Sequence, residues 1–178
     1  RILAALPVLF VAWFFRDPER STPADKDAVF SPADGKVIEV CDERDPVVGL
    51  STKVAVFMSV LSVHVNRAPV TGTVVDVRYK PGTFHVASLG RKTAANERMS
   101  ILIETERGMF RVDQVAGLVA RRISCWVKPG ERVTAGQRIG LIRFGSLLEC
   151  WMPQGFVPVC ERSQMVRAGE SPIGRRTQ

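Results

Sequence analysis

The chain has 178 residues, 46% of them hydrophobic, and a formal net charge of +7. This length and apolar content suit one compact domain with a hydrophobic core, and the charge favours an anionic partner: nucleic acid, an acidic membrane surface or a phosphorylated substrate. Because aromatic residues make up only 7% of the chain and no basic segment is interleaved with them, nucleic acid is not among the expected partners.

Residues 1–15, "RILAALPVLFVAWFF", form an apolar segment that is followed by a polar linker at 16–27. As a helix, the apolar run would be about 21 Å long, which is shorter than the roughly 30 Å hydrocarbon core of a bilayer. Its last three residues, "WFF", meet charged residues abruptly, as aromatic residues do at a membrane interface. We therefore expect a membrane-associating helix that does not cross the bilayer as written. Since the chain begins with arginine, we expect the numbering to start inside a longer protein.

From residue 28 onward the pattern consists of short segments rich in Val, Ile and Phe, separated by Gly, Pro, Asp or Asn. No segment keeps a 3.6-residue apolar period over three turns. The pattern predicts an all-β domain over 28–178, built as a barrel or a sandwich of many short strands.

Two pairs of segments resemble each other. "PADGKVIEV" at 32–40 matches "PVTGTVVDV" at 69–77, and "VTAGQRIG" at 133–140 matches "VRAGESPIG" at 166–174 with one residue inserted. These similarities predict a pseudo-symmetric fold of two related halves. The segment "VKPGERVTAGQRIGLI" also resembles the half-repeat of lipoyl and biotinyl carrier domains. It lacks the lysine that such a carrier modifies, so the predicted likeness of the C-terminal half is one of fold.

The four cysteines show no C-x-x-C spacing, and the chain has only two histidines. This composition offers no metal site. Each cysteine has apolar neighbours, so we expect free thiols in a reducing compartment.

A Gly-Ser pair, Gly145-Ser146, lies in the apolar segment "LIRFGSLLECWMP", which otherwise suits a buried strand. A glycine inside a strand marks a bulge or a close approach by another group. Two interpretations are open: a bulge on an edge strand, or a backbone bond that a catalyst must reach.

His64 ends an apolar segment just before "NRAP", and Asp34 lies at a predicted turn in "SPADGKV". A general base needs a near-neutral imidazole held in one tautomer by a carboxylate, with a serine such as Ser146 as its nucleophile. The alternative is a structural histidine and a turn carboxylate that caps its own loop. The other histidine, His85, is interpreted as structural.

Five segments, in this order, resemble the phosphatidylserine decarboxylase proenzymes of the short type: "SPADGKV", "FMSVLSVHVNRAPVTG", "NERM", "VAGLVARRI" and "RFGS". The resemblance runs from about residue 13 to the C-terminus, and "HVNRAP" together with "FGS" is its most specific part. It implies a precursor that cleaves itself at Gly145-Ser146 into a β chain, 1–145, and an α chain, 146–178.

The resemblance also implies the chemistry. Ser146 would be the nucleophile of self-cleavage and then become a pyruvoyl group that forms a Schiff base with the substrate, without metal or pyridoxal phosphate. His64 would be the general base and acid, and Asp34 would orient it. The implied reaction is decarboxylation of phosphatidylserine to phosphatidylethanolamine and CO2.

Weaker candidates for substrate binding are Asn96 and Arg98 in "NERM", Arg121 and Arg122 in "VARRI", and Glu149. Paired arginines suit a phosphate group. A surface turn with an ion pair explains the first two equally well, and a solvated face explains the arginines.

The expected partners are phosphatidylserine in a membrane and the two chains of the protein itself, which form a heterodimer; a homo-oligomer is left open. We expect the enzyme at the cell membrane with its site on the cytoplasmic side. An archaetidylserine headgroup would fit the same site. Two other functions are open: a non-enzymatic, carrier-like β binding domain, and a serine hydrolase that uses Ser146 without cleaving itself.

Overall fold

The computed structural model describes residues 2–83, 95–117, 122–143 and 145–177. These residues form one helix and fourteen strands, which confirms the mainly β class. The elements are, in chain order, α1 (Ile2–Phe14), β1 (Ala28–Phe30), β2 (Gly35–Asp45), β3 (Gly49–Met58), β4 (Val65–Arg67), β5 (Gly72–Lys80), β6 (Arg98–Thr105), β7 (Gly108–Ala116), β8 (Ile123–Cys125), β9 (Arg132–Val133), β10 (Arg138–Ile142), β11 (Ser146–Pro153), β12 (Phe156–Pro158), β13 (Met165–Val166) and β14 (Pro172–Arg176).

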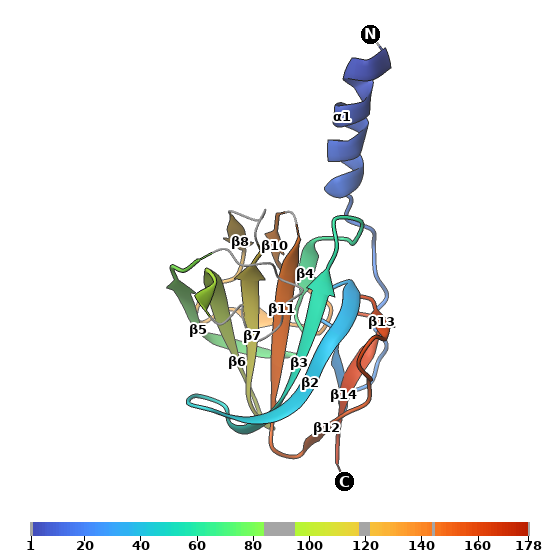
Figure 1. The fold of residues 1–178 in the computed structure, drawn as a ribbon. Helices are drawn as coiled ribbons and strands as arrows, with labels where there is room; N and C mark the ends of the chain where they lie inside the picture. Colours follow the sequence, from blue (N-terminus) through green and yellow to red (C-terminus); the bar gives the residue numbers. More distant parts are fainter. Residues whose placement is uncertain (1, 84–94, 118–121, 144, 178) are drawn as a thin grey trace.

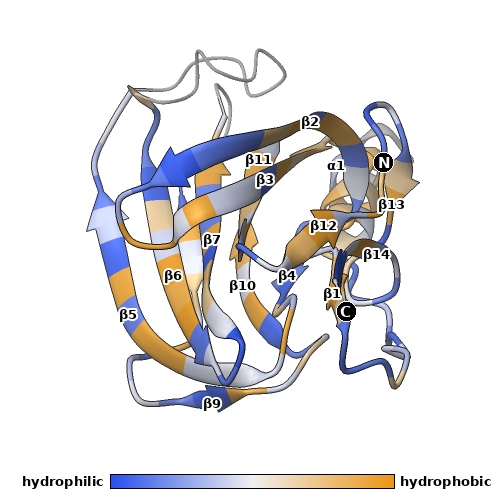
Figure 2. Cartoon of the chain, turned by 90° about the horizontal axis from the view of Figure 1, so that it is seen from below, coloured by the Kyte–Doolittle hydropathy of each residue, from blue (hydrophilic) through white to orange (hydrophobic). Residues whose placement is uncertain are grey.

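One large antiparallel sheet dominates the domain, with eight strands in the order β13-β2-β3-β11-β7-β6-β5-β9. Two small sheets, β1-β14-β12 and β4-β10-β8, accompany it. Seen from below, the large sheet curls around β4 and β10 as a half-barrel (Figure 2). Its two edge strands, β13 and β9, are only two residues long and pair only with the first residues of β2 and β5.

The two ends of the large sheet are built in the same way, with a short edge strand paired to the start of a long one. β13 pairs with the start of β2, where Val166 lies opposite Gly35, and β9 pairs with the start of β5, where Val133 lies opposite Gly72. Both β2 and β5 are bulged just after the second residue that follows their glycine. A Cβ atom on either glycine would collide with a carbonyl oxygen of the neighbouring strand, so both positions require glycine. This correspondence is what the two internal similarities predict.

The main hydrophobic core joins the large sheet to both small sheets. It includes Val56 and Leu148 from the large sheet, Ile139 from β10 and Ile173 from β14, all fully buried. Each such side chain contributes about 1.5–3 kcal/mol by leaving water. The four cysteines are free, as the sequence predicts.

Helix α1 projects from the end of the domain where β3 ends and β4 begins, opposite the C-terminus (Figure 1). From Leu6 to Trp13 its side chains are exposed, with Leu6, Val8 and Leu9 at 59%, 68% and 64%. Within the described ranges, no helix combines the length and apolar character that crossing a membrane requires.

Residues 16–27 form neither helix nor strand, yet charged side chains bind them to the domain. Arg67 is buried and pairs with Asp17 at 3.2 Å, and Arg138 pairs with the same carboxylate at 2.6 Å. Arg20 pairs with Glu170 at 2.9 Å. The polar segment is therefore fastened along the domain between α1 and β1.

Candidate active site

The Gly145-Ser146 bond lies where the chain passes from a small sheet into the centre of the large one. β10 ends at Ile142 and β11 begins at Ser146, so the prediction of a continuous strand through the Gly-Ser pair is wrong. The apolar pattern is continuous because both strands are buried, in different sheets. Gly145 has φ = +62°, in the left-handed region that side chains other than glycine rarely adopt.

Ser146 is fully buried as the first residue of β11. It lies opposite Met58 of β3 and Ala116 of β7, both of which belong to the main core. Its Oγ has no hydrogen-bond partner within the described part of the chain. A buried polar group without a partner costs about 1–3 kcal/mol, so the fold tolerates a penalty at this hydroxyl.

His64 directly precedes β4 and is also fully buried. Its carbonyl oxygen accepts a hydrogen bond from the Ile142 amide at 3.4 Å, which brings it beside the segment that leads to Ser146. Nδ1 lies 2.9 Å from the carbonyl oxygen of Ser62 and must donate there, which leaves Nε2 as an unprotonated acceptor. Among the described residues this Nε2 has no partner.

The imidazole of His64 is held in its neutral form. Burial lowers its pKa to about 4, with a smaller contribution from the positive charge of Arg16 and against the hydrogen bond to Ser62. The ring of Phe14, the last residue of α1, packs on it with centroids 4.2 Å apart. At neutral pH the imidazole is thus unprotonated, so the lone pair of Nε2 is available, although the lowered pKa makes it a weaker base than an exposed histidine.

Asp34 and His64 have different hydrogen-bond partners among the described residues. The Asp34 carboxylate accepts hydrogen bonds from the Arg20 guanidinium at 2.8 Å and from the Ala168 amide at 2.7 Å. The tautomer control that the sequence assigned to Asp34 falls to the carbonyl of Ser62, and an orienting role for Asp34 stays a prediction. The missed partner, Arg20, lies in the segment that was interpreted as a linker.

Arg98 and Glu149 lie on the face of the large sheet opposite to Ser146. Side chains alternate along β11, so Ser146 faces the main core while Glu149 faces the other way. Arg98 lies 3.5 Å from Glu149 and 3.2 Å from Asp113. Burial, and then the charge of Asp113, raise the pKa of the Glu149 carboxyl. Asn96 is buried and donates to the carbonyl of Ala116 at 2.8 Å, so it supports the strand beside Ser146.

Arg122 is exposed, and its carbonyl accepts a hydrogen bond from the Arg143 amide at 3.4 Å, three residues before Ser146. Arg121 and His85 lie outside the described residues.

Two functional candidates escaped the sequence reasoning. Asn66 and Gln114 are fully buried, and the Gln114 Nε2 donates to the Asn66 Oδ1 at 2.8 Å. The available signals were the two-residue spacing from His64 to Asn66 and a glutamine between two valine-containing steps of the strand segment "RVDQVA".

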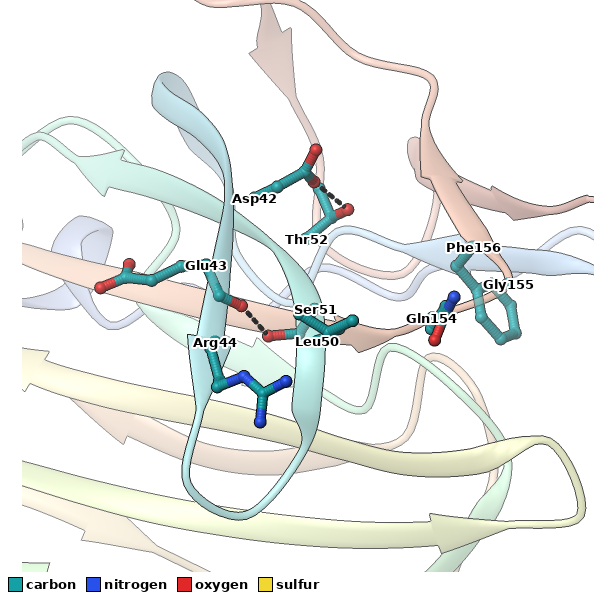
Figure 3. A pocket seen from close by; sticks show the side chains of 9 residues that line it. All are labelled: Asp42, Glu43, Arg44, Leu50, Ser51, Thr52, Gln154, Gly155 and Phe156. Carbon is teal, nitrogen blue, oxygen red and sulfur yellow. Dashed lines mark hydrogen bonds between the residues drawn. The ribbon is translucent and has the colours of Figure 1, made fainter.

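A pocket of about 400 Å³ lies away from these residues, on the β2–β3 hairpin (Figure 3). Hydrogen bonds from Thr52 to Asp42 at 2.6 Å and from Ser51 to the Glu43 carbonyl at 2.9 Å cross this hairpin. The pocket is lined by Asp42, Glu43, Arg44, Leu50, Ser51, Thr52, Gln154, Gly155 and Phe156. It contains none of the predicted site residues.

Comparison with known proteins gives one consistent result. The family model for phosphatidylserine decarboxylase matches residues 8–174. A phosphatidylserine decarboxylase proenzyme of Syntrophus aciditrophicus is 44% identical over 178 residues, covering 97% of this chain and 84% of the relative. Proenzymes of the same name from Beijerinckia indica and Geobacter sulfurreducens are 46% and 48% identical, covering 98% and 93% of this chain and 77% of each relative. The chain belongs to the phosphatidylserine decarboxylase family.

Proposed function

We propose that this chain is the precursor of a pyruvoyl-dependent enzyme that converts phosphatidylserine to phosphatidylethanolamine and CO2 after cleaving itself at Gly145-Ser146. The observation that carries the proposal is the burial of two groups that have no hydrogen-bond partner among the described residues. One is the Nε2 of the neutral His64 imidazole, whose backbone is hydrogen-bonded to Ile142, and the other is the Oγ of Ser146, which follows the bond. The family membership supplies the substrate and the reaction.

Self-cleavage follows from these groups. His64 Nε2 takes the proton of the Ser146 hydroxyl, and Oγ attacks the carbonyl carbon of Gly145. The C–N bond breaks, the Ser146 nitrogen receives the proton, and an ester replaces the amide. Loss of the Cα proton then breaks the Cβ–Oγ bond and releases Gly145 as a carboxyl terminus. Water replaces the nitrogen of the remaining dehydroalanine, ammonia leaves, and a ketone remains at position 146.

The position of Ser146 suits a residue that is converted into a pyruvoyl group at a new chain end. It is fully buried at the start of a central strand, where a new chain end stays held by β3 and β7. When formed, the pyruvoyl group supplies an electron sink for the loss of the substrate carboxyl. The role of His64 in that reaction is to take a proton from the substrate amine as the imine forms and to return it, from the same Nε2, to the carbon that has lost CO2.

The same geometry supports a heterodimer of the protein's own two chains. Residues 146–151 pair with strands on both sides, so the α chain would stay in the sheet without a covalent link. The carrier-like C-terminal half is part of this proposal, because β9, β10, β13 and β14 contain the repeated segments.

We further propose that α1 lies in the membrane interface, on its cytoplasmic side. Helix α1 lies at the end of the domain where β4 begins (Figure 1), its last residue packs on His64, and its apolar side chains from Leu6 to Trp13 are exposed. Leu61, in the loop before His64, is 68% exposed, and its carbonyl accepts a hydrogen bond from Arg16 at 2.6 Å. This surface would deliver a lipid headgroup next to the site, and Arg122 would contact its phosphate.

Intact mass spectrometry of the purified protein, with an assay for phosphatidylethanolamine formed from phosphatidylserine vesicles, tests the proposal. We expect two pieces, 1–145 and 146–178, the second with a ketone in place of its terminal amine, and one uncut chain for Ser146→Ala. An active wild-type protein that stays whole would contradict self-cleavage. If a fluorophosphonate labels Ser146 of an uncut chain, the protein is a serine hydrolase instead.

A further inference from the structure

Asn66 and Gln114, here called the amide pair, form a buried polar contact within the main core. Besides the bond between them, the Asn66 Nδ2 lies 3.6 Å from the sulfur of Met58, a weak acceptor. The Gln114 Oε1 has no partner among the described residues. An acceptor left unpaired in a dry environment costs about 1–3 kcal/mol, so its presence requires a reason.

The amide pair lies next to Ser146 in the strand register. Ser146 is opposite Ala116, and Gln114 is two residues from Ala116 on the same face of β7. Such diagonal neighbours are about 7–8 Å apart, within reach of a long side chain. On the other side, Met58 is opposite Ser146 and contacts Asn66. The free oxygen of Gln114 therefore belongs to the surroundings of residue 146.

A glycine in β10 leaves the space in which the two amide side chains meet. Asn66 lies opposite Gly140 in the pairing of β4 with β10. A Cβ atom on Gly140 would collide with the Gln114 amide and with a carbonyl of β8. Gln114 thus reaches Asn66 across a position that only glycine leaves open.

The related half of the fold has apolar residues at the positions equivalent to the amide pair. Val29 lies opposite Gly174 in the pairing of β1 with β14, with the same register shift as in β4 and β10. A Cβ atom on Gly174 would collide with the sulfur of Met152. Valine and methionine thus fill, in the main core, the two places that the amide pair fills beside Ser146. The fold itself does not need amides at these places.

We propose that the free Oε1 of Gln114, fixed by Asn66, accepts a hydrogen bond from the amino group of the serine headgroup and positions it next to residue 146. This inference rests on the proposed function. Of the three polar groups in that headgroup, the carboxylate and the phosphate are acceptors and are disfavoured next to a carbonyl oxygen. Only the amine carries N–H donors, and it is the group that must reach the ketone at position 146.

The test compares lipids that differ in N–H donors. Calorimetry of the processed enzyme measures binding of dioctanoyl phosphatidylethanolamine, whose amine has N–H groups, and of dioctanoyl phosphatidylcholine, whose nitrogen has none. Gln114→Met introduces the residue of the other half and should weaken ethanolamine-lipid binding about fivefold, as expected for one hydrogen bond, without changing choline-lipid binding. Gln114→Glu keeps an acceptor and should retain the preference. Met152→Leu, in the equivalent place, is the matched control.

Each remaining outcome decides the matter. If Gln114→Met lowers both affinities equally, or Gln114→Glu loses the preference as Gln114→Met does, the side chain is structural and the inference is overturned. If Gln114→Met does not cleave itself while Gln114→Glu does, Gln114 acts on the Ser146 hydroxyl instead, which also overturns it. Failure of the proposed function is distinct, because then the wild-type protein itself forms no phosphatidylethanolamine.

Discussion

The aromatic ring of Phe14 packs on the imidazole of His64, with centroids 4.2 Å apart and planes inclined by 34°. Both side chains are fully buried, although the eight helix residues before Phe14, from Leu6 to Trp13, are exposed. The helix is thereby joined to the candidate base itself. This contact removes water from His64 and contributes to the burial that keeps it neutral.

Replacement of His64 by glutamine should stop or strongly slow self-cleavage. Removal of a general base costs about 10²–10⁴-fold in rate, because the serine hydroxyl then has no acceptor for its proton. Intact mass after expression should show one chain. His85→Gln is the matched control and should yield two chains. Complete cleavage of the His64→Gln protein would exclude His64 as the base.

The protonation of His64 should make stability depend on pH. Its folded pKa of about 4 lies below the unfolded value of 6.5, so the unfolded state binds the proton first as pH falls. The contribution to stability is present above pH 6.5 and is lost progressively down to about pH 4, by up to about 3 kcal/mol. Denaturant titrations of Ser146→Ala should show this loss. The same titrations of the double variant Ser146→Ala with His64→Gln should lack this loss. If the free energy of unfolding of both proteins falls equally between pH 6.5 and pH 4, the assignment to His64 is wrong.

Gly145→Ala should slow self-cleavage through the backbone alone. Apart from its chain neighbours, no described residue has a heavy atom within 4 Å of a Cβ at this position, so the penalty is the left-handed φ of +62°, about 1–2 kcal/mol. Gly49 also has a positive φ, +85°, with free space, on the distant β2–β3 hairpin. Gly49→Ala should therefore lower the melting temperature similarly while cleavage, followed by mass, stays complete. Equal cleavage in both variants would show that the conformation of Gly145 is not required.

Arg20 and Asp34 should act as a unit. The side chains of this ion pair are only 10% and 15% exposed, and loss of either partner leaves a poorly solvated charge. We expect Arg20→Gln and Asp34→Asn each to destabilise the fold by about 1–3 kcal/mol, with non-additive effects in the double variant. If Asp34→Asn abolishes cleavage while Arg20→Gln leaves it intact, Asp34 acts on the site directly.

Charged substitutions on α1 should weaken membrane binding without affecting self-cleavage. Leu6→Glu with Leu9→Glu places two charges on a surface that is now apolar and exposed. Co-sedimentation with phosphatidylserine vesicles should fall by at least about tenfold, because two leucine side chains no longer enter the interface. Val157→Glu, at a 44% exposed position of β12, is the control. Equal binding of all three proteins would remove α1 from the proposal.

The sequence predicts the β class and the duplication because periodicity and turn residues are local signals. It does not predict the break between β10 and β11, since the apolar residues of both strands serve one core. Nor does it predict the partner of Asp34, because Arg20 lies in a polar segment that resembles a solvated linker. The amide pair was missed for a related reason: a glutamine in a strand looks exposed until the curl of the sheet turns it inward.

The central position of β11 implies that the sheet folds before the chain cleaves itself. Residues 146–151 acquire neighbours on both sides only when β3 and β7, from distant parts of the chain, have already come together. On the proposed mechanism, His64 and the Ser146 hydroxyl do not meet in an unfolded or partly folded chain, so self-cleavage would follow the completion of folding. On the same mechanism, a molecule with a misassembled sheet would not form the pyruvoyl group and would stay inactive.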